Sequence, residues 1–479
     1  MYATVIVASK QAGIGNGLTY SAPQASQNLL GYLVRVPLRK KLVEGIVVDL
    51  SEKKPEGDFD VKEIAGVIGT APLLFESQIA LAKWIAEYYC CSLRQAIGLF
   101  LPGKPWSKLL ENRKDEIDEA ERDKKKLSIV HCQLSTVSLT PRQTAAYKAI
   151  KGEKRPMLLF GVTGSGKTEI YAALIADAIR EGRSAILLLP EILLTENFIG
   201  RFEQLIHRQA IALIHSRLTL AKRRNEWKKC AAGEIRLVIG SRSALFSPLP
   251  NLGLIIIDEE HEWTYKNEQA PRYHAGKVAE QLRFGLGFGK QVKIVLGSAT
   301  PSLESWHKAK EGMYQLVELP ERYGNAKLPT VRVIDLGEVK FGKHYPLSPA
   351  LLEAIRLRLE HHEQCILFLN RRGFATNLLC RECRYRFEDP ETKLPYTVHR
   401  RGVGVPHVMV SGVEPWGTQG APEARPYKQS YLLSHHTGET LPIPETCPKC
   451  SSTNLFELGA GTQRLESLLS ELFPEARIL

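Results

Sequence analysis

Short runs of alternating apolar and polar residues dominate the first hundred residues, and Gly, Pro and Asn separate these runs. A period of two is typical of strands that bury one face, so strands are predicted within residues 4–9, 32–38 and 44–50. Apolar residues then recur at helical spacing across residues 77–103. We therefore predict a β-rich domain over residues 1–104 that is capped by a helix.

The pattern changes at a densely charged stretch, residues 107–126, which favours a solvated helix or linker and places a boundary within 105–138. From residue 139 onward, short runs of Leu, Ile and Val alternate with helical stretches, which is typical of a parallel sheet covered on both faces. The predicted fold class is therefore α/β, with a nucleotide-binding sheet. The strand-like runs lie at residues 157–160, 185–190, 254–261, 293–300 and 365–370.

Composition narrows the class of protein without identifying a function. The 479 residues are 44% hydrophobic and 24% charged, which is typical of a folded protein of several domains and excludes disordered or fibrous classes. The chain has no apolar run long enough for a membrane span and no signal-like N-terminus, so a cytoplasmic protein without membrane contact is expected. The net charge of +12 favours a polyanionic partner.

A phosphate-binding loop stands between a predicted strand and a predicted helix, in the segment GVTGSGKT that begins at Gly161. Its glycines let backbone amides converge on phosphate oxygens, Lys167 neutralises the β- and γ-phosphates, and Thr168 offers a hydroxyl to Mg²⁺. Upstream, the Gln143 amide can pair with both edges of adenine, which favours ATP over GTP. The predicted ATP-binding residues are Gln143, Gly161, Gly164, Gly166, Lys167 and Thr168.

Two acids follow the buried run at residues 254–257, at a place where carboxylates are costly unless a metal ion and a water use them. We expect Asp258 to hold Mg²⁺ and Glu259 to polarise the attacking water, so Lys167, Asp258 and Glu259 are the predicted catalytic residues. The hydroxyls of Ser298 and Thr300 end a later strand and can hydrogen-bond this acidic cluster.

With these motifs the chain resembles the superfamily 2 helicases, and most closely the PriA family of bacterial replication-restart helicases. The resemblance implies a RecA-like helicase lobe, 3′→5′ translocation, and reloading of the replicative helicase at abandoned forks. It also implies single-stranded and forked DNA, primosome proteins and the helicase loader as partners of a monomer. The strings that carry it lie at residues 189–195, 215–216, 239–246, 258–266 and 298–305.

A loop rich in aromatic and basic residues follows the acids. Aromatic faces stack on bases and cations pair with phosphates, so DNA binding is predicted for Trp263, Tyr265, Lys266 and Arg272, with a packing loop as the alternative. In the family, this loop couples single-strand binding to hydrolysis. One arginine of the family's pattern is replaced here by Gly276.

The N-terminal domain resembles the family's domain that binds the 3′ end of DNA, although its motifs are weaker. The resemblance places Leu18, Thr19 and Lys62 at the pocket for a 3′-terminal nucleotide, and a purely structural role is as plausible for each. The family's winged-helix module is expected to be absent or vestigial, because only the charged segment stands in its place.

Four of the nine cysteines form two C-x-x-C pairs, Cys380 with Cys383 and Cys447 with Cys450. Two such pairs supply four thiolates for a tetrahedral zinc site. The other cysteines show no paired spacing and are expected to be ordinary thiols. These are Cys90, Cys91, Cys132, Cys230 and Cys365.

Members of the family carry four such pairs and two zinc ions, and the outermost pairs share one ion. Here the positions of the inner pairs hold Asp389, Thr392, Ser434 and Thr437. All ligands of one site are replaced while those of the other remain, so a single Zn²⁺ is expected. His399, His435 and His436 are nearby but are expected to lie in an irregular insertion.

The resemblance divides the remainder into helicase lobe 1 at 139–322, the start of lobe 2 at 323–379, a zinc-binding insertion at 380–450, and a further lobe 2 segment at 451–479. The strings at residues 368–373 and 461–464 belong to lobe 2, and the later helicase motifs, which include an arginine finger, are not found.

We therefore expect a C-terminally truncated family member that alone hydrolyses ATP poorly. Two alternatives remain, a small-molecule kinase and a DNA-binding or primosome-loading module without effective helicase activity. DNA-stimulated ATP hydrolysis separates the kinase from the helicase.

Overall fold

The computed structural model divides into two compact units, Met1–Leu328 and Pro329–Leu479. Each unit is described by itself. The described residues are 1–8, 15–22, 28–53, 60–110, 137–193, 196–283, 292–322, 329–336, 339, 344, 346–368, 377–380, 382–400, 430–434, 437–458 and 462–478.

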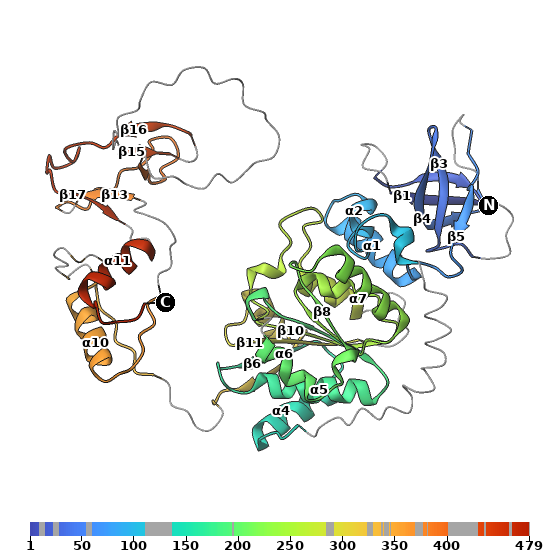
Figure 1. The fold of residues 1–479 in the computed structure, drawn as a ribbon, viewed down its shortest axis with the longest axis horizontal. Coiled ribbons are helices and arrows are strands. Elements are labelled where there is room, and N and C mark those ends of the chain that lie inside the picture. The colour runs from blue at the N-terminus through green and yellow to red at the C-terminus, as the bar shows by residue number, and fades with distance from the viewer. Residues whose placement is uncertain are drawn as a thin grey trace. The chain divides into compact units, whose positions relative to one another are not determined.

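The N-terminal part is an antiparallel sheet in the strand order β2-β1-β4-β3-β5 (Figure 1). Side chains alternate between its faces: Val5 and Val34 join one hydrophobic cluster, whereas Ile6 and Leu33 join another. The period of two therefore predicted the three longer strands, and each face is buried. The strands are β1 (Tyr2–Val7), β2 (Leu18–Ser21), β3 (Leu33–Leu38), β4 (Lys41–Ser51) and β5 (Gly66–Ile68).

The helical stretch after this sheet is two helices, α1 (Glu76–Tyr88) and α2 (Leu93–Ile97), where one helix was predicted. The chain breaks because Cys90 adopts a φ of +49°, which no helix allows. Ser92 then starts α2 with a capping box, in which its hydroxyl accepts from the Gln95 amide at 3.3 Å.

The central sheet of the first unit is parallel throughout, in the order β12-β6-β11-β10-β7-β9-β8. Most of its Leu, Ile and Val side chains are buried, and they lie on both faces, as the continuous apolar runs predicted. The strands are β6 (Met157–Gly161), β7 (Ser184–Leu188), β8 (Ile211–Ile214), β9 (Leu237–Gly240), β10 (Leu252–Asp258), β11 (Lys293–Ser298) and β12 (Gln315–Leu319).

Helices cover both faces of this sheet (Figure 1). They are α4 (Pro141–Gly152), α5 (Lys167–Arg180), α6 (Glu196–Glu203), α7 (Leu220–Ala232), α8 (Ala275–Arg283) and α9 (Leu303–Lys310). Helices α4, α5 and α6 contribute to one hydrophobic cluster, and α7 and α8 contribute to the other. Short 3₁₀ turns lie at η1 (Trp106–Leu109), η2 (Glu191–Leu193), η3 (Arg208–Ala210), η4 (Arg242–Phe246) and η5 (Trp263–Tyr265).

The N-terminal part and the parallel sheet share one core. A single hydrophobic cluster contains Ile85 and Phe100 of the N-terminal part together with Trp227 of α7. The indole of Trp227 donates to the Phe100 carbonyl at 2.8 Å, and the rings of Phe100 and Phe246 meet edge to face at 5.1 Å. Within the first unit, therefore, the two sheets are held by buried side chains.

The second unit contains helices α10 (Pro349–Glu360) and α11 (Thr462–Leu472) and two small sheets. Strand β13 (Asn377–Cys380) pairs antiparallel with β17 (Leu455–Leu458). The other sheet contains β14 (Thr397–Arg400), β15 (Ser430–Leu433) and β16 (Thr440–Pro442).

The strand predicted at residues 365–370 is not formed over its described part, 365–368, so this prediction was wrong there. Ile366 is 96% exposed and Phe368 is 89% exposed. A parallel strand requires neighbours that bury its faces and pair with its amides, and none of the described strands pairs with this segment.

Candidate functional site

The predicted phosphate-binding loop connects the end of β6 to the start of α5. Gly164 has a φ of +78° and Gly166 a φ of +80°, a region that residues with a Cβ rarely adopt, so glycine permits the turn. Between them, the buried hydroxyl of Ser165 has no hydrogen-bond partner among the described residues. A buried unpaired hydroxyl beside a helix N-terminus fits a phosphate oxygen as its partner.

Lys167 and Gln143 both hold this loop in the structure. The amine of Lys167 is buried and donates to the Gly161 carbonyl at 2.9 Å. The amide of Gln143 donates to the Ser165 carbonyl at 3.2 Å, and its oxygen accepts from the Thr140 amide at 2.9 Å, which completes a capping box at α4. The adenine contact expected of Gln143 stays a prediction, since its amide bonds here to protein groups.

The acids lie at the same edge of the sheet as the loop, because β6, β10 and β11 are parallel and end together. Asp258 is the last residue of β10 and is buried. Burial raises the pKa of the Asp258 carboxyl, and a hydrogen bond from Tyr171 acts in the opposite direction. Glu259, the next residue, has a φ of +45°, which is unusual outside glycine and is common at functional sites.

The next two residues join β10 to the segment after β11. The Glu260 carboxylate accepts from the Ser302 amide at 2.7 Å and from the Ser305 hydroxyl at 2.7 Å. The Nδ1 atom of His261 lies 2.8 Å from the Ser298 hydroxyl. The position of Ser298 beside the acidic cluster was expected, whereas no role was predicted for Ser302 or Ser305. The S-x-x-S spacing that starts α9 is the signal for them, because Ser302 caps that helix.

The aromatic-rich loop presents some of its predicted residues and buries another. Trp263 is 69% exposed, which leaves its ring accessible. Tyr265 is only 1% exposed, and its hydroxyl donates to the Asp258 carbonyl at 2.6 Å. A base-stacking role for Tyr265 therefore does not fit its burial, since a stacking ring needs an open face. Arg272 is exposed, and its Nε donates to the Glu268 carbonyl at 3.2 Å.

The other side of this loop contacts the N-terminal part. The Tyr89 hydroxyl accepts from the His274 amide at 3.1 Å, and the amine of Lys266 lies 5.2 Å from the centre of the Tyr89 ring. Arg242 donates to the Thr264 carbonyl at 2.6 Å. No sequence pattern indicates the Tyr89 contact, because it joins residues far apart along the chain.

The three N-terminal candidates lie on strand β2 and on the segment beside its end. Leu18 and Thr19 lie on β2, and both are partly exposed. The Ser21 amide donates to the carbonyl of the exposed Lys62 at 2.9 Å, which places Lys62 beside the end of that strand. Their predicted contact with a DNA end stays a prediction.

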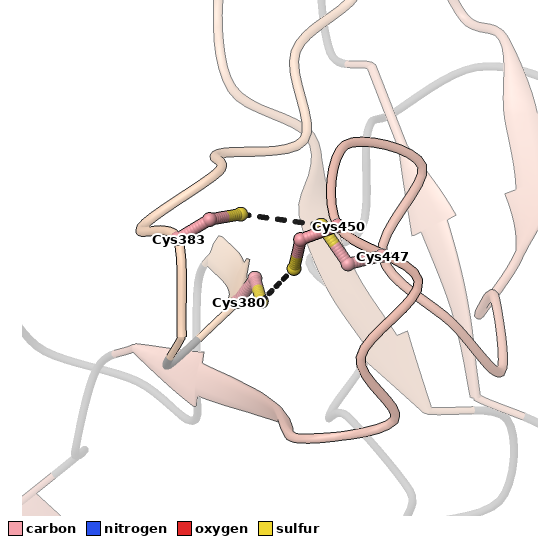
Figure 2. Close-up of side chains that lie close together, drawn as sticks. All are labelled: Cys380, Cys383, Cys447 and Cys450. Atoms are coloured by element: carbon pink, nitrogen blue, oxygen red, sulfur yellow. Dashed lines mark hydrogen bonds between the residues drawn. The ribbon is translucent and has the colours of Figure 1, made fainter.

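The four paired cysteines form one cluster in the second unit (Figure 2). Their sulfur atoms lie within 4.8 Å of one another, with 3.5 Å between Cys380 and Cys450 and 3.5 Å between Cys383 and Cys447. Tetrahedral Zn–S bonds of about 2.3 Å require sulfur separations of roughly 3.8 Å, so this cluster fits zinc binding. The backbone amide of Cys383 lowers the pKa of Cys380 to about 7, which favours the thiolate form.

All four positions that replace the family's inner cysteine pairs are joined by hydrogen bonds, because Asp389 accepts from the other three. Its carboxylate accepts from the Thr392 amide at 3.1 Å and from the Thr437 hydroxyl at 2.7 Å. Hydrogen bonds from Ser434 and Thr437 hold the pKa of Asp389 well below its usual range. His435 and His436 lie outside the described residues, as do residues 369–376 and 401–429 of the predicted lobe 2 and insertion.

Two family models match segments of the first unit. The family model described as the 3′ DNA-binding domain of PriA matches residues 4–102, and a DEAD/DEAH box helicase model matches residues 140–309. A solved structure of RecG bound to a three-way DNA junction is 21% identical, covers 49% of this chain and 31% of RecG, and gives a TM-score of 0.31. Of the helices within the described ranges, none has the length and hydropathy that a membrane span requires.

Relatives that bear the name replication restart protein PriA include proteins from Bacillus subtilis and Chlamydia muridarum. The Bacillus subtilis protein is 38% identical over 71% of this chain, and the match spans 39% of that relative. The Chlamydia muridarum protein is 30% identical, and its match covers 100% of this chain and 70% of the relative. Because similarity extends over the whole chain and over both matched domains, this chain belongs to the PriA family of replication restart proteins.

Proposed function

We propose that the chain is an ATP-dependent 3′→5′ DNA helicase of replication restart, which recognises stalled forks and initiates primosome assembly in the cytoplasm. One observation carries the proposal. The parallel sheet, whose edge with the phosphate-binding loop and the acids Asp258 and Glu259 is here called the nucleotide edge, shares one hydrophobic core with the N-terminal sheet, which matches the 3′ DNA-binding domain. A helicase domain packed against a domain that binds DNA 3′ ends suits an enzyme that begins unwinding at a fork.

The nucleotide edge supplies the groups that ATP hydrolysis requires. The loop amides and the buried Ser165 hydroxyl bind phosphate oxygens, and Lys167 neutralises their charge. Thr168 and Asp258 hold Mg²⁺, which stabilises the negative charge that develops on the phosphates. Glu259 orients the attacking water and accepts its proton.

The DNA-binding surface is proposed to combine the exposed part of the aromatic-rich loop with the N-terminal sheet. Trp263 stacks on a base, and Lys266 and Arg272 neutralise phosphates. The surface at Leu18, Thr19 and Lys62 receives the 3′ end. The cysteine cluster binds one Zn²⁺, and other primosome proteins and the helicase loader are the further partners of a monomer.

This function is tested by measuring ATP hydrolysis by the full chain with forked DNA, with linear duplex DNA and without DNA. Forks with a free 3′ hydroxyl should stimulate hydrolysis most, a 3′ phosphate should reduce the stimulation, and Lys167→Ala should abolish hydrolysis. Unwinding by this chain alone should be weak, and any that occurs should favour duplexes with a 3′ overhang over those with a 5′ overhang. Hydrolysis that is indifferent to DNA contradicts the proposal and favours a small-molecule kinase.

A DNA-binding and primosome-loading module without effective unwinding is the second candidate. It is favoured by the exposed segment 365–368, where a strand of the second helicase lobe was expected. Fork binding without strand separation in the same assays supports this candidate.

A further inference from the structure

Asp258 is contacted by two tyrosines that come from different parts of the first unit. The Tyr171 hydroxyl of α5 donates to the Asp258 carboxylate at 2.8 Å, and the Tyr265 hydroxyl of the aromatic-rich loop donates to the Asp258 carbonyl at 2.6 Å. Both side chains are among the largest that are fully buried in the described residues. Buried phenol hydroxyls therefore hold both the carboxylate and the carbonyl group of Asp258.

The Tyr265 contact acts on the peptide group that connects the two catalytic acids. That group is planar, so the Asp258 carbonyl and the Glu259 amide turn together. The carbonyl accepts from the Tyr265 hydroxyl, so this hydrogen bond bears on the orientation of the whole peptide group. Glu259 holds a φ of +45°, and the orientation of this peptide group helps to fix that unusual conformation. A displacement of Tyr265 therefore alters where the Glu259 carboxylate points.

The loop that carries Tyr265 also carries the exposed Trp263. Both residues belong to one short turn, η5 (Trp263–Tyr265), and the amide of Lys266 closes it by donating to the Trp263 carbonyl at 2.9 Å. A ligand that moves Trp263 must consequently also shift Tyr265, because both residues lie in the same short turn. From outside the loop, the Tyr89 hydroxyl accepts from the His274 amide, and Arg242 donates to the Thr264 carbonyl.

We propose that Tyr265 is a positioning residue that couples the aromatic-rich loop to the catalytic acids, and that Tyr171 holds the Asp258 carboxylate against that movement. The inference rests on the proposed function, since it presumes that the loop binds single-stranded DNA and that the edge binds Mg·nucleotide. Neither tyrosine needs to touch ATP or DNA.

Thermodynamic linkage in the full chain measures this coupling directly. The affinity for a non-hydrolysable ATP analogue with Mg²⁺ is titrated with and without a single-stranded oligonucleotide. Oligonucleotide affinity is then titrated with and without the analogue. The two affinity ratios must agree, because coupling between sites is reciprocal, and a ratio of roughly 5 to 150 is typical.

Tyr265→Phe removes one hydroxyl and should bring the ratio to within about twofold of one. Tyr273→Phe is the matched control, because Tyr273 is equally buried in the same segment and interacts with Arg242 instead of Asp258. It should retain the wild-type ratio. Tyr171→Phe should weaken the Mg²⁺-dependent part of analogue affinity in the absence of DNA.

Hydrogen exchange on the wild-type chain gives a second readout that needs no variant. Addition of the Mg²⁺ analogue alone should change the protection of the loop amides at residues 264–267. Unchanged loop exchange, an unaltered ratio in Tyr265→Phe, or an equal loss in Tyr273→Phe overturns the inference. A wild-type chain that binds both ligands with a ratio of one overturns it while the proposed function stands. A chain that binds neither ligand overturns both.

Discussion

Gly297→Ala should damage the nucleotide edge, although it adds one methyl group to a strand. A Cβ at Gly297 would lie 1.7 Å from the Tyr171 hydroxyl oxygen and 3.2 Å from a carboxylate oxygen of Asp258. The first separation is impossible, so Tyr171 must move and release Asp258. The loss of a hydrogen bond to a charged group costs about 1.5 to 3 kcal/mol, and overpacking costs about 1 to 3 kcal/mol.

The expected loss in the free energy of unfolding of the first unit is therefore about 2.5 to 6 kcal/mol, measured by urea denaturation. Tyr171→Phe removes the clashing oxygen and leaves the ring carbon Cζ at 2.9 Å from the new methyl group, so the ring must still shift but by much less. In that background the cost of Gly297→Ala should fall by at least half, because the two sites are in contact.

Gly152→Ala is the matched control for the added methyl group. A Cβ there meets nothing within 4 Å, and Gly152 ends helix α4 at an exposed position. This change should be neutral or slightly stabilising. A loss below about 1 kcal/mol for Gly297→Ala, or the same loss with and without Tyr171, refutes the reasoning about this contact.

Four further predictions concern the candidate sites. Lys167→Ala should weaken ATP binding with the fold intact, and equal affinity for both proteins by calorimetry contradicts the nucleotide site. The chain should contain one zinc ion by elemental analysis, and Cys380→Ser should release it, whereas two ions show that a second site exists. Trp263→Ala should reduce single-strand affinity by about 1 to 3 kcal/mol in fluorescence titrations, and an unchanged affinity removes the stacking contact. The pKa of Asp389 is depressed in the folded protein, so its stabilising effect should be present above the unfolded pKa of about 4 and be lost as the pH falls. Asp389→Asn should flatten this acid dependence, which is measured by hydrogen exchange of β14 and β15.

Hydrophobic periodicity predicted the elements whose burial is local in the sequence. The parallel strands that end at Asp258 and Ser298 are short, continuous apolar runs between helical stretches, a pattern that is typical of strands buried on both faces. The break between α1 and α2 was missed because the apolar spacing continues through Cys90. The segment 365–368 failed for the opposite reason, since an apolar run forms a strand only when neighbouring strands pair with it.

The candidate site was predictable where a motif carries its own chemistry. A glycine-rich loop before a helix and acids after a buried strand require no knowledge of distant residues. Tyr171 and Tyr265 were different, because each lies in an ordinary pattern and its contact with Asp258 depends on tertiary packing. The paired cysteines fall between these cases, because their spacing indicates a metal and the pairing of β13 with β17 brings them together.

Burial and hydrogen bonding act in opposite directions on Asp258, and their balance explains why Tyr171 lies there. Removal from water disfavours the charged carboxylate and raises the pKa of Asp258, whereas the Tyr171 hydroxyl stabilises the charged form. A protonated carboxyl is a poor ligand for a divalent cation, since the proton and the ion compete for the same oxygen atoms. The donated hydrogen bond therefore opposes the rise in the pKa of Asp258 that burial causes, and it favours the charged carboxylate at the strand end. Glycine at position 297 is required because a side chain there would occupy the space of that hydroxyl.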